Sequence, residues 1–151
     1  MKKPSSIKSP VRILHLEDNP NDAQLVERTL ADAGVPCSIT RVATRAEYMA
    51  ALEGKSIDLI LCDNSLPSFD GLSALRLCRE ASPDLPFIFV TGTMGEERAI
   101  ESMQSGATDY VLKERLSRLC PAVRRAMQEV EARAETRRTE EVLEETQNGC
   151  G

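Results

Sequence analysis

The chain has 151 residues, of which 41% are hydrophobic and 28% are charged, and its net charge at pH 7 is −5. A chain of this length forms one domain with at most a short appendage, and it can bury enough apolar surface to fold without disulfides or a structural metal. The acidic balance argues against nucleic acid as the main partner, because binding to a phosphate backbone requires a concentrated positive field.

Cysteine and histidine usage excludes further classes of protein. None of the five cysteines forms a Cys-x-x-Cys pair, so neither a zinc site nor a disulfide framework is indicated. The single histidine, His15, excludes metal sites that need two imidazoles. The amino-terminal segment lacks a signal-peptide core, and no apolar run approaches the ~18 residues of a membrane span. We therefore expect a cytoplasmic protein with free thiols that makes no contact with a membrane.

The first half of the chain predicts two strands, each followed by a helix. Short apolar or alternating runs indicate the strands, and a 3.6-residue periodicity indicates the helices. Asn19 before Pro20 predicts the start of the first helix, and Thr44 predicts the start of the second. The elements are, in order, a polar lead-in over residues 1–10, strand Val11–Leu16, a helix to about Ala33, strand Cys37–Val42 and a helix to about Leu52.

The second half continues the same alternation. Its strands at residues 57–62 and 86–90 are almost wholly apolar, which is typical of central parallel strands that are covered on both faces. The elements are strand Ile57–Cys62, a loop over residues 67–71, a helix from Leu72 to about Ala81, strand Pro86–Val90, a helix over residues 96–105, strand Asp109–Leu112 and a continuous helix from Leu116. This order predicts an α/β fold, in which a doubly wound, five-stranded parallel sheet carries helices on both faces and an extended C-terminal helix.

Polar side chains follow four of the predicted strands. Glu17 and Asp18 come after the first strand, Asp63 after the third, Thr91 after the fourth and Lys113 after the fifth. In an open parallel α/β sheet, ligands bind outside the carboxyl ends of the strands. We therefore expect these five side chains to converge at one edge of the sheet.

Each residue type in this group has a chemical use. Clustered carboxylates repel one another unless a cation joins them, and a small site with only oxygen ligands suits Mg²⁺. An aspartate carboxylate can also act as a covalent nucleophile toward a phosphoryl group. Lys113 would supply positive charge and the Thr91 hydroxyl a hydrogen bond, which is most of what phosphoryl transfer requires.

Four segments of the chain resemble the response-regulator receiver domains of two-component signalling. They are Leu-Glu-Asp-Asn (16–19), Leu-Cys-Asp-Asn-Ser-Leu-Pro-Ser-Phe-Asp-Gly (61–71), Val-Thr-Gly (90–92) and Gly-Ala-Thr-Asp-Tyr-Val-Leu-Lys (106–113). The match covers about residues 10–125 in the correct order. The resemblance implies a flavodoxin-like sheet with strand order 2-1-3-4-5, which is the order found in the chemotaxis regulator of this family. It also implies a signalling domain that catalyses only its own phosphorylation and dephosphorylation.

The resemblance further implies a role for each residue. Asp63 accepts the phosphoryl group from a histidine kinase or phosphotransfer protein, and Lys113 pairs with the phosphate. Thr91 bonds a phosphoryl oxygen, and Tyr110 rotates inward after it to change a protein-binding face. The metal ligands for Mg²⁺ are Glu17, Asp18, Asp63 and the backbone carbonyl of Ser65.

Three positions raise questions that the sequence leaves open. The family usually has proline after the lysine, often with a cis bond, but this chain has Glu114; a non-proline cis bond costs about 3 kcal/mol, so we expect a trans bond. Tyr110 could be a core aromatic instead of a switch. His15, between Leu14 and Leu16, is expected to be an interior histidine whose hydrogen bonds are satisfied, and not a phosphocarrier.

The last predicted helix is longer than the fold needs. An apolar stripe packs its first half on the sheet; the stripe consists of Leu116, Leu119, Val123, Met127 and Val130. Beyond it, residues of both charges lie close together along the chain. This pattern suits either a solvated helical tail or a coiled coil that forms a homodimer or carries a signal to a further domain, as in the linker that joins N-terminal receivers to sensor or kinase modules in larger proteins. We therefore divide the chain into a lead-in (1–10), a receiver domain (11–128), a helical linker or coiled coil (129–147) and an end without structure (148–151).

Two other functions compete with a phospho-acceptor. A phosphatase that forms an aspartyl phosphate usually keeps a second aspartate two residues after its nucleophile, where this chain has Ser65. A nucleic-acid-binding regulator would have to use arginines of the last helix, between which acidic residues lie. These candidates are Arg118, Arg124, Arg125, Arg133, Arg137 and Arg138. The sequence does not identify the kinase, the stimulus or the output.

Overall fold

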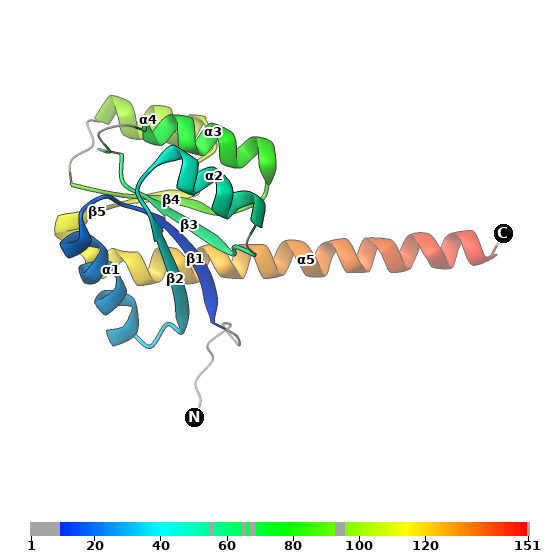
Figure 1. Ribbon diagram of the computed structural model, residues 1–151. Helices are drawn as coiled ribbons and strands as arrows, with labels where there is room; N and C mark the ends of the chain where they lie inside the picture. Colours follow the sequence, from blue (N-terminus) through cyan, green and yellow to red (C-terminus); the bar gives the residue numbers. More distant parts are fainter. Residues whose placement is uncertain (1–9, 55, 65, 67–68, 93–95, 151) are drawn as a thin grey trace.

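The computed structural model describes residues 10–54, 56–64, 66, 69–92 and 96–150, with the backbone alone at residues 96 and 137–150. Five parallel strands form one sheet in the order β2-β1-β3-β4-β5 (Figure 1). The strands are β1 (Val11–Leu16), β2 (Cys37–Val42), β3 (Leu59–Cys62), β4 (Phe87–Thr91) and β5 (Asp109–Leu112). The predicted fold class and the strand order implied by the resemblance are both confirmed.

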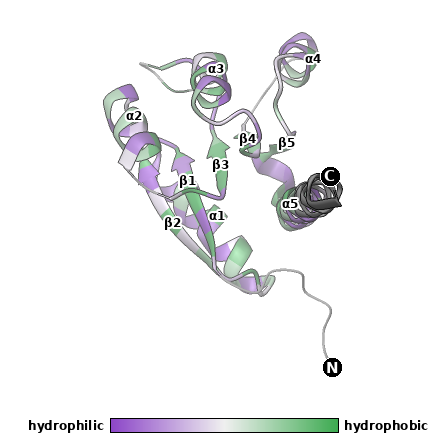
Figure 2. Ribbon diagram, turned by 90° about the vertical axis from the view of Figure 1, so that its right-hand side faces the viewer, coloured by the Kyte–Doolittle hydropathy of each residue, from purple (hydrophilic) through white to green (hydrophobic). Residues whose placement is uncertain are grey.

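Five α-helices cover the two faces of this sheet. They are α1 (Pro20–Asp32), α2 (Arg45–Gly54), α3 (Gly71–Ala81), α4 (Glu96–Gln104) and α5 (Leu119–Cys150). Helices α1 and α5 lie on one face, and α2, α3 and α4 lie on the other (Figures 1 and 2). Because every connection between parallel strands crosses over with a helix, all the carboxyl ends of the strands meet at the same edge of the sheet.

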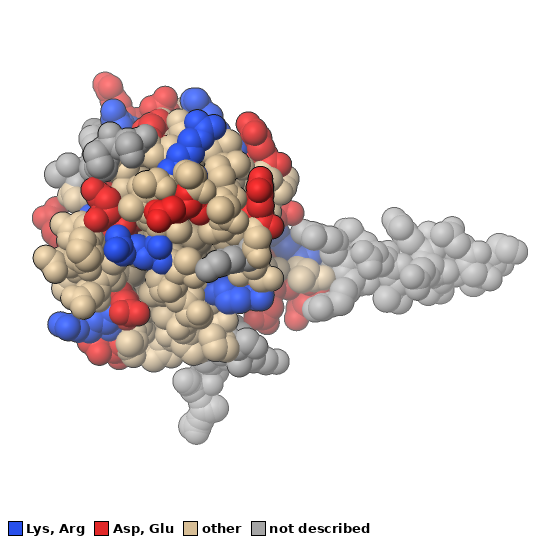
Figure 3. All heavy atoms as spheres, viewed as in Figure 1, with Lys and Arg blue, Asp and Glu red and all other residues tan. Residues whose placement is uncertain are grey.

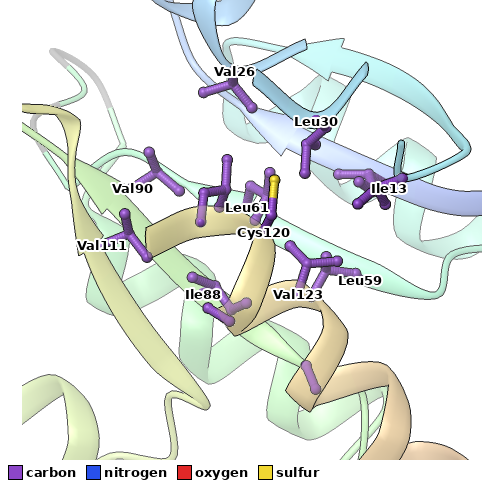
Figure 4. Close-up of a cluster of buried hydrophobic side chains, with 14 of the residues drawn as sticks. Ile13, Val26, Leu30, Leu59, Leu61, Ile88, Val90, Val111, Cys120 and Val123 are labelled. Carbon is purple, nitrogen blue, oxygen red and sulfur yellow. The ribbon is translucent and has the colours of Figure 1, made fainter. Parts of the chain in front are cut away.

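The alternation of side chains along the strands divides the core into two clusters. On one face, Ile13 and Leu61 pack against Val123 of α5 and Leu30 of α1 (Figure 4). On the other face, Leu14, Ile60 and Phe89 belong to the cluster that contains Tyr48, Leu75 and Cys78. β3 is hydrophobic along its whole length and buried on both faces (Figure 2), as expected for a central parallel strand. The described cysteines, Cys37, Cys62, Cys78 and Cys120, are free thiols.

The first two helices begin at the predicted caps. The side chain of Asn19 accepts hydrogen bonds from the backbone N–H groups of Asn21 and Asp22, and Pro20 occupies the first position of α1. In α2, the Thr44 hydroxyl accepts a bond from the Glu47 N–H at 3.2 Å, while the Glu47 carboxylate accepts one from the Thr44 N–H at 3.3 Å. This reciprocal arrangement satisfies N–H groups that the first turn of a helix leaves unpaired.

The chain after β5 differs from the predicted helix in two places. Residues Lys113–Arg118 form a 3₁₀ helix with a kink at Arg115, so that α5 begins at Leu119 and not at Leu116. The Lys113–Glu114 bond is trans, as expected. At the other end, α5 continues to Cys150, so the prediction that residues 148–150 lack structure is wrong. Extending an existing helix by one residue avoids the cost of nucleation, so the strong helix formers before Asn148 can propagate it.

Candidate functional site

Four strand ends bring the predicted site residues together. Glu17 and Asp18 follow β1, and Asp63 follows β3. The backbone N–H of Asp63 donates to the Leu16 carbonyl at 3.0 Å, which joins the ends of these two neighbouring strands. Thr91 is the last residue of β4, and Lys113 comes directly after β5. These residues therefore lie at the carboxyl edge of the sheet, where the sequence predicts the site.

Three of the carboxylates form a compact cluster. One oxygen from each of Glu17, Asp18 and Asp63 lies within 4.8 Å of the others. Glu17 and Asp63 are buried at 0% and 4% exposure, while Asp18 is exposed. The Asn19 N–H donates to Glu17 Oε2 at 3.1 Å. The cluster is thus open to solvent on the side of Asp18 and closed on the side of the sheet.

Lys113 is the ammonium group that faces this cluster. Its Nζ lies 2.9 Å from Glu17 Oε1 and 3.0 Å from Asp63 Oδ2. A third carboxylate, that of Asp22 in the first turn of α1, lies closer still, with Oδ2 at 2.6 Å. Burial alone would lower the pKa of Lys113, but the contacts of its ammonium with the carboxylates of Asp22, Glu17 and Asp63 outweigh burial and raise that pKa. Lys113 is therefore charged at neutral pH.

Asp22 is the site residue that the sequence reasoning missed. A signal for it was present, because the Asn19-Pro20 start places Asp22 in the first turn of a helix that begins at the ligand-binding edge. Nothing local to Asp22 identifies Lys113 as its partner, however, since the two residues are 91 positions apart.

The donor set fits a hard cation such as Mg²⁺. Burial raises the pKa of Glu17, although Lys113 and the Asn19 N–H act in the opposite direction. Among the described residues, Glu17 Oε1 has its ion pair with Lys113 and no hydrogen bond of its own. A buried carboxylate oxygen of this kind, beside two further carboxylates, matches the oxygen-only sites that Mg²⁺ prefers. Ser65, whose carbonyl was expected to contribute, lies outside the described residues.

The two predicted switch residues lie on neighbouring strands. Thr91 is fully buried, whereas 41% of Tyr110 is exposed. Phe89 pairs with Tyr110 and Thr91 with Leu112 in the register of β4 and β5. Because successive side chains alternate between faces, Thr91 and Tyr110 belong to the same face of the sheet. Tyr110 is thus at the surface and not in the core.

His15 lies in the interior beneath the site. It is 0% exposed, and in the part of the chain that the structure describes neither of its ring nitrogens has a hydrogen-bond partner. Burial is the main reason that its pKa is lowered to about 4, and the positive charges of Lys113 and Arg41 add to the effect. The expectation that His15 is an interior residue is confirmed, but the expectation that its hydrogen bonds are satisfied is wrong for the described part of the chain.

Comparison with known proteins agrees with this geometry. The family model described as "Response regulator receiver domain" matches residues 13–124. The DNA-binding transcriptional regulator NtrC of Escherichia coli (strain K12) is 35% identical over 98 residues, which is 65% of this chain and 20% of the regulator. The chain thus spans about a fifth of the length of that relative.

Two solved structures show the same fold. The CheY-like response regulator receiver domain protein from Methanospirillum hungatei JF-1 has a TM-score of 0.73 at 26% identity, covering 83% of this chain and 99% of that one. The receiver domain of sensor histidine kinase PA1611 from Pseudomonas aeruginosa PAO1, which has a magnesium ion in its active-site cleft, has a TM-score of 0.68 at 29% identity and covers 80% of this chain and 99% of that one. The fold, the clustered carboxylates and the family match lead to one conclusion: this chain belongs to the response regulator receiver domain family.

Proposed function

We propose that this chain is the phospho-acceptor of a two-component phosphorelay, and that Asp63 receives the phosphoryl group from a histidine kinase or phosphotransfer protein. The observation that supports this most strongly is the position of Asp63 between the carboxylates of Glu17 and Asp18 and the ammonium of Lys113, whose Nζ lies 3.0 Å from Asp63 Oδ2. A buried aspartate at the end of a central strand, beside a charged lysine, has the composition of a phosphoryl-transfer site.

The transfer itself requires little from the protein beyond position and charge. A carboxylate oxygen of Asp63 forms a bond to phosphorus while the bond from phosphorus to the donor's imidazole nitrogen breaks. The imidazole keeps the electron pair of that bond, and the product is an acyl phosphate on Asp63. Lys113 stabilises the negative charge on the phosphoryl oxygens, and Thr91 offers a hydroxyl as a hydrogen-bond donor to one of them.

Glu17, Asp18, Asp63 and the backbone carbonyl of Ser65 are the groups that would hold Mg²⁺. When bound, the ion supplies positive charge against the carboxylates and the phosphoryl oxygens.

We propose that the output of this event is a changed protein-binding face. Thr91 and Tyr110 share a face of the sheet, and Tyr110 is exposed, as are two apolar residues of α4, Ile100 and Met103. If Thr91 moves toward the phosphoryl group, Tyr110 gains room to turn inward, and the apolar surface changes. On the face shown in Figure 3, basic and acidic side chains are intermixed, which supports a protein partner over nucleic acid.

We also propose that the receiver comprises residues 11–128 and that residues 129–147 act as a cytoplasmic linking helix that pairs with a second copy. Helix α5 extends far beyond the sheet (Figure 1), and Val130 is an apolar residue of this helix that is 37% exposed. Sedimentation of the chain should show a dimer, and Val130→Glu should shift it to the monomer; a wild-type monomer at high micromolar concentration would contradict this.

The phospho-acceptor proposal is tested by adding acetyl phosphate and Mg²⁺ and measuring the intact mass. Wild type should gain one phosphoryl group, in a linkage that survives acid but not base. The gain should be lost without Mg²⁺ and in Asp63→Asn. Absence of the gain in a wild-type protein that is folded and binds Mg²⁺ would contradict the proposal: the chain would then be a docking module that works without phosphate, or its function would be a different one.

A further inference from the structure

Three carboxylates surround the Lys113 ammonium, and two of them, those of Asp22 and Asp63, accept hydrogen bonds from it. An ammonium group has three donors, and the carboxylates of Asp22, Glu17 and Asp63 lie within 3.0 Å of Nζ. The shortest of these contacts, at 2.6 Å, belongs to Asp22 and not to Asp63. A phosphoryl oxygen that arrives at Asp63 must therefore compete with these carboxylates, and above all with Asp22, for the Lys113 ammonium.

The position of Asp22 is set by α1. Its backbone N–H donates to Asn19 Oδ1 at 3.3 Å, in the first turn of the helix. Val26 and Leu30, farther along α1, are buried in the core and hold the helix on the sheet. Asp22 is thus a carboxylate at a fixed place, toward which the flexible side chain of Lys113 extends.

Asp22 is also the outermost of the three carboxylates. Its side chain is 30% exposed, against 6% for Asp63 and 0% for Glu17. It does not belong to the cluster of Glu17, Asp18 and Asp63 whose oxygens could share a cation, as far as the described residues show. Its role is therefore separable from metal binding: it engages the lysine from the solvent side, where a phosphodonor enters.

We propose that Asp22 is a positioning residue that holds the Lys113 ammonium partly away from Asp63 and thereby slows phosphoryl transfer. This inference rests on the proposed function. If Asp22 loses its charge, the Lys113 ammonium becomes more available to Asp63 and to the incoming phosphoryl oxygen. It also removes one negative charge from the path of an anionic donor. Both effects act in the same direction, toward faster phosphorylation.

The test is the initial rate of phosphorylation by acetyl phosphate, measured against donor concentration at saturating Mg²⁺. We expect Asp22→Asn to raise the rate by about three- to tenfold, the range expected when one charge is removed beside a half-buried ammonium. The rate at saturating donor should rise as well as the apparent affinity, because a freed lysine acts after the donor has bound. Asp22→Glu, which restores a carboxylate, should return the rate to within about twofold of wild type.

Glu27→Gln is the matched control, because Glu27 is an exposed acidic residue of the same helix and its substitution changes the net charge equally. This substitution should change the phosphorylation rate by less than about twofold, and high salt should remove that change. The effect of Asp22→Asn should persist in high salt, because the close, partly buried pair of Asp22 and Lys113 is screened far less. Thermal unfolding with Mg²⁺ checks that each variant is folded.

Three outcomes would overturn the inference. They are an unchanged or slower rate in Asp22→Asn, an equal increase in Glu27→Gln, and an increase confined to the apparent affinity for the donor. A wild-type chain that acetyl phosphate does not modify would overturn the proposed function and this inference with it. If acetyl phosphate modifies the wild type but phosphorylates Asp22→Asn no faster, the inference about Asp22 is wrong and the proposed function still stands.

Discussion

At the scale of single residues, the site is an excess of carboxylates around one lysine. Glu17, Asp22 and Asp63 all contact Lys113, and Asp18 lies beside Glu17 and Asp63 on the solvent side. The carboxylates repel one another unless a further cation reduces their net negative charge. Binding of a metal ion should therefore raise the free energy of unfolding.

Asp18 provides a test of that linkage. Mg²⁺ at ten times its dissociation constant should raise the free energy of unfolding of the wild type by ~1.4 kcal/mol, because it binds only the folded state. Asp18→Asn should lose most of this gain while leaving the ion pairs of Lys113 in place. Urea unfolding with and without Mg²⁺ measures both. Asp70→Asn, which changes an exposed carboxylate at the start of α3, is the control and should keep the full gain.

His15 predicts how stability depends on pH. Its pKa is about 4 in the folded chain against 6.5 ordinarily, so below pH 6.5 the unfolded chain takes up a proton that the folded chain does not. The free energy of unfolding should therefore fall as the pH drops from about 6.5 toward 4, by at most ~1.4 kcal/mol per pH unit from this residue. Lys113 and Arg41 act with burial to keep His15 neutral, and Asp63 and Asp22 act against it.

His15→Val removes this group and should flatten that part of the profile. Urea unfolding at about pH 7.5, 6.5 and 5.5 on both proteins isolates the effect, because their carboxylates titrate alike. Equal slopes in the two proteins would show that His15 is protonated in the folded state or that its environment differs from the one described.

At the scale of elements, the start of α3 controls the loop after Asp63. A Cβ placed on Gly71 would lie 2.8 Å from Asn64 Oδ1 and 2.8 Å from Phe89 Cε1, whereas one placed on Gly54 at the end of α2 would meet nothing within 4 Å. Contacts this close force either the loop that contains Asn64 or the core ring of Phe89 to move.

The two glycines form a matched pair of substitutions. Gly71→Ala should destabilise the fold by about 1–3 kcal/mol through overpacking, and should slow phosphorylation because the residue after Asp63 shifts. Gly54→Ala should be neutral or should stabilise by up to ~1 kcal/mol, because alanine is the better helix former and the space is open. Thermal unfolding of both variants, beside their rates with acetyl phosphate, checks this. A stabilised Gly71→Ala would show that Asn64 can move at little cost.

At the scale of the whole molecule, α5 has two parts with different surroundings. Leu119, Val123 and Ala126 are buried in the core that α5 shares with α1 and the sheet (Figure 4). From Gln128 to Arg133 the residues are exposed. Within the described part of the chain, no helix combines the length and the apolar character that crossing a membrane requires.

This division predicts the result of truncation. At a concentration at which the full chain is monomeric, a chain that ends after Ala134 should unfold with a free energy within about 0.5 kcal/mol of the full chain, because the described core residues all precede Ala134. A chain that ends after Ala122 should fail to fold, because it loses Val123 and Ala126 from the core. Circular dichroism and urea unfolding distinguish the cases. If the longer truncated chain were strongly destabilised under these conditions, residues beyond Ala134 would have to pack against the domain itself.

Patterns in the sequence are sufficient to predict the class of fold and to place most of the candidate site residues at one edge of the sheet. Apolar runs such as Leu59–Cys62 identify buried parallel strands, and caps such as Asn19 and Thr44 identify helix starts, because these signals depend on neighbouring residues. The parallel order then places Glu17, Asp63, Thr91 and Lys113 at one edge. The strand order came from the family resemblance and not from the pattern.

The contacts among those residues follow from the tertiary packing and not from any sequence pattern. The bond between Asp22 and Lys113 joins two positions that no periodicity relates, and it depends on how α1 is seated on the sheet. The same holds for the ring nitrogens of His15, which lack a hydrogen-bond partner among the described residues, and for the kink at Arg115 and the exposure of Tyr110. Each is set by the packing of segments that are distant in the chain, and local propensity carries no information about that packing.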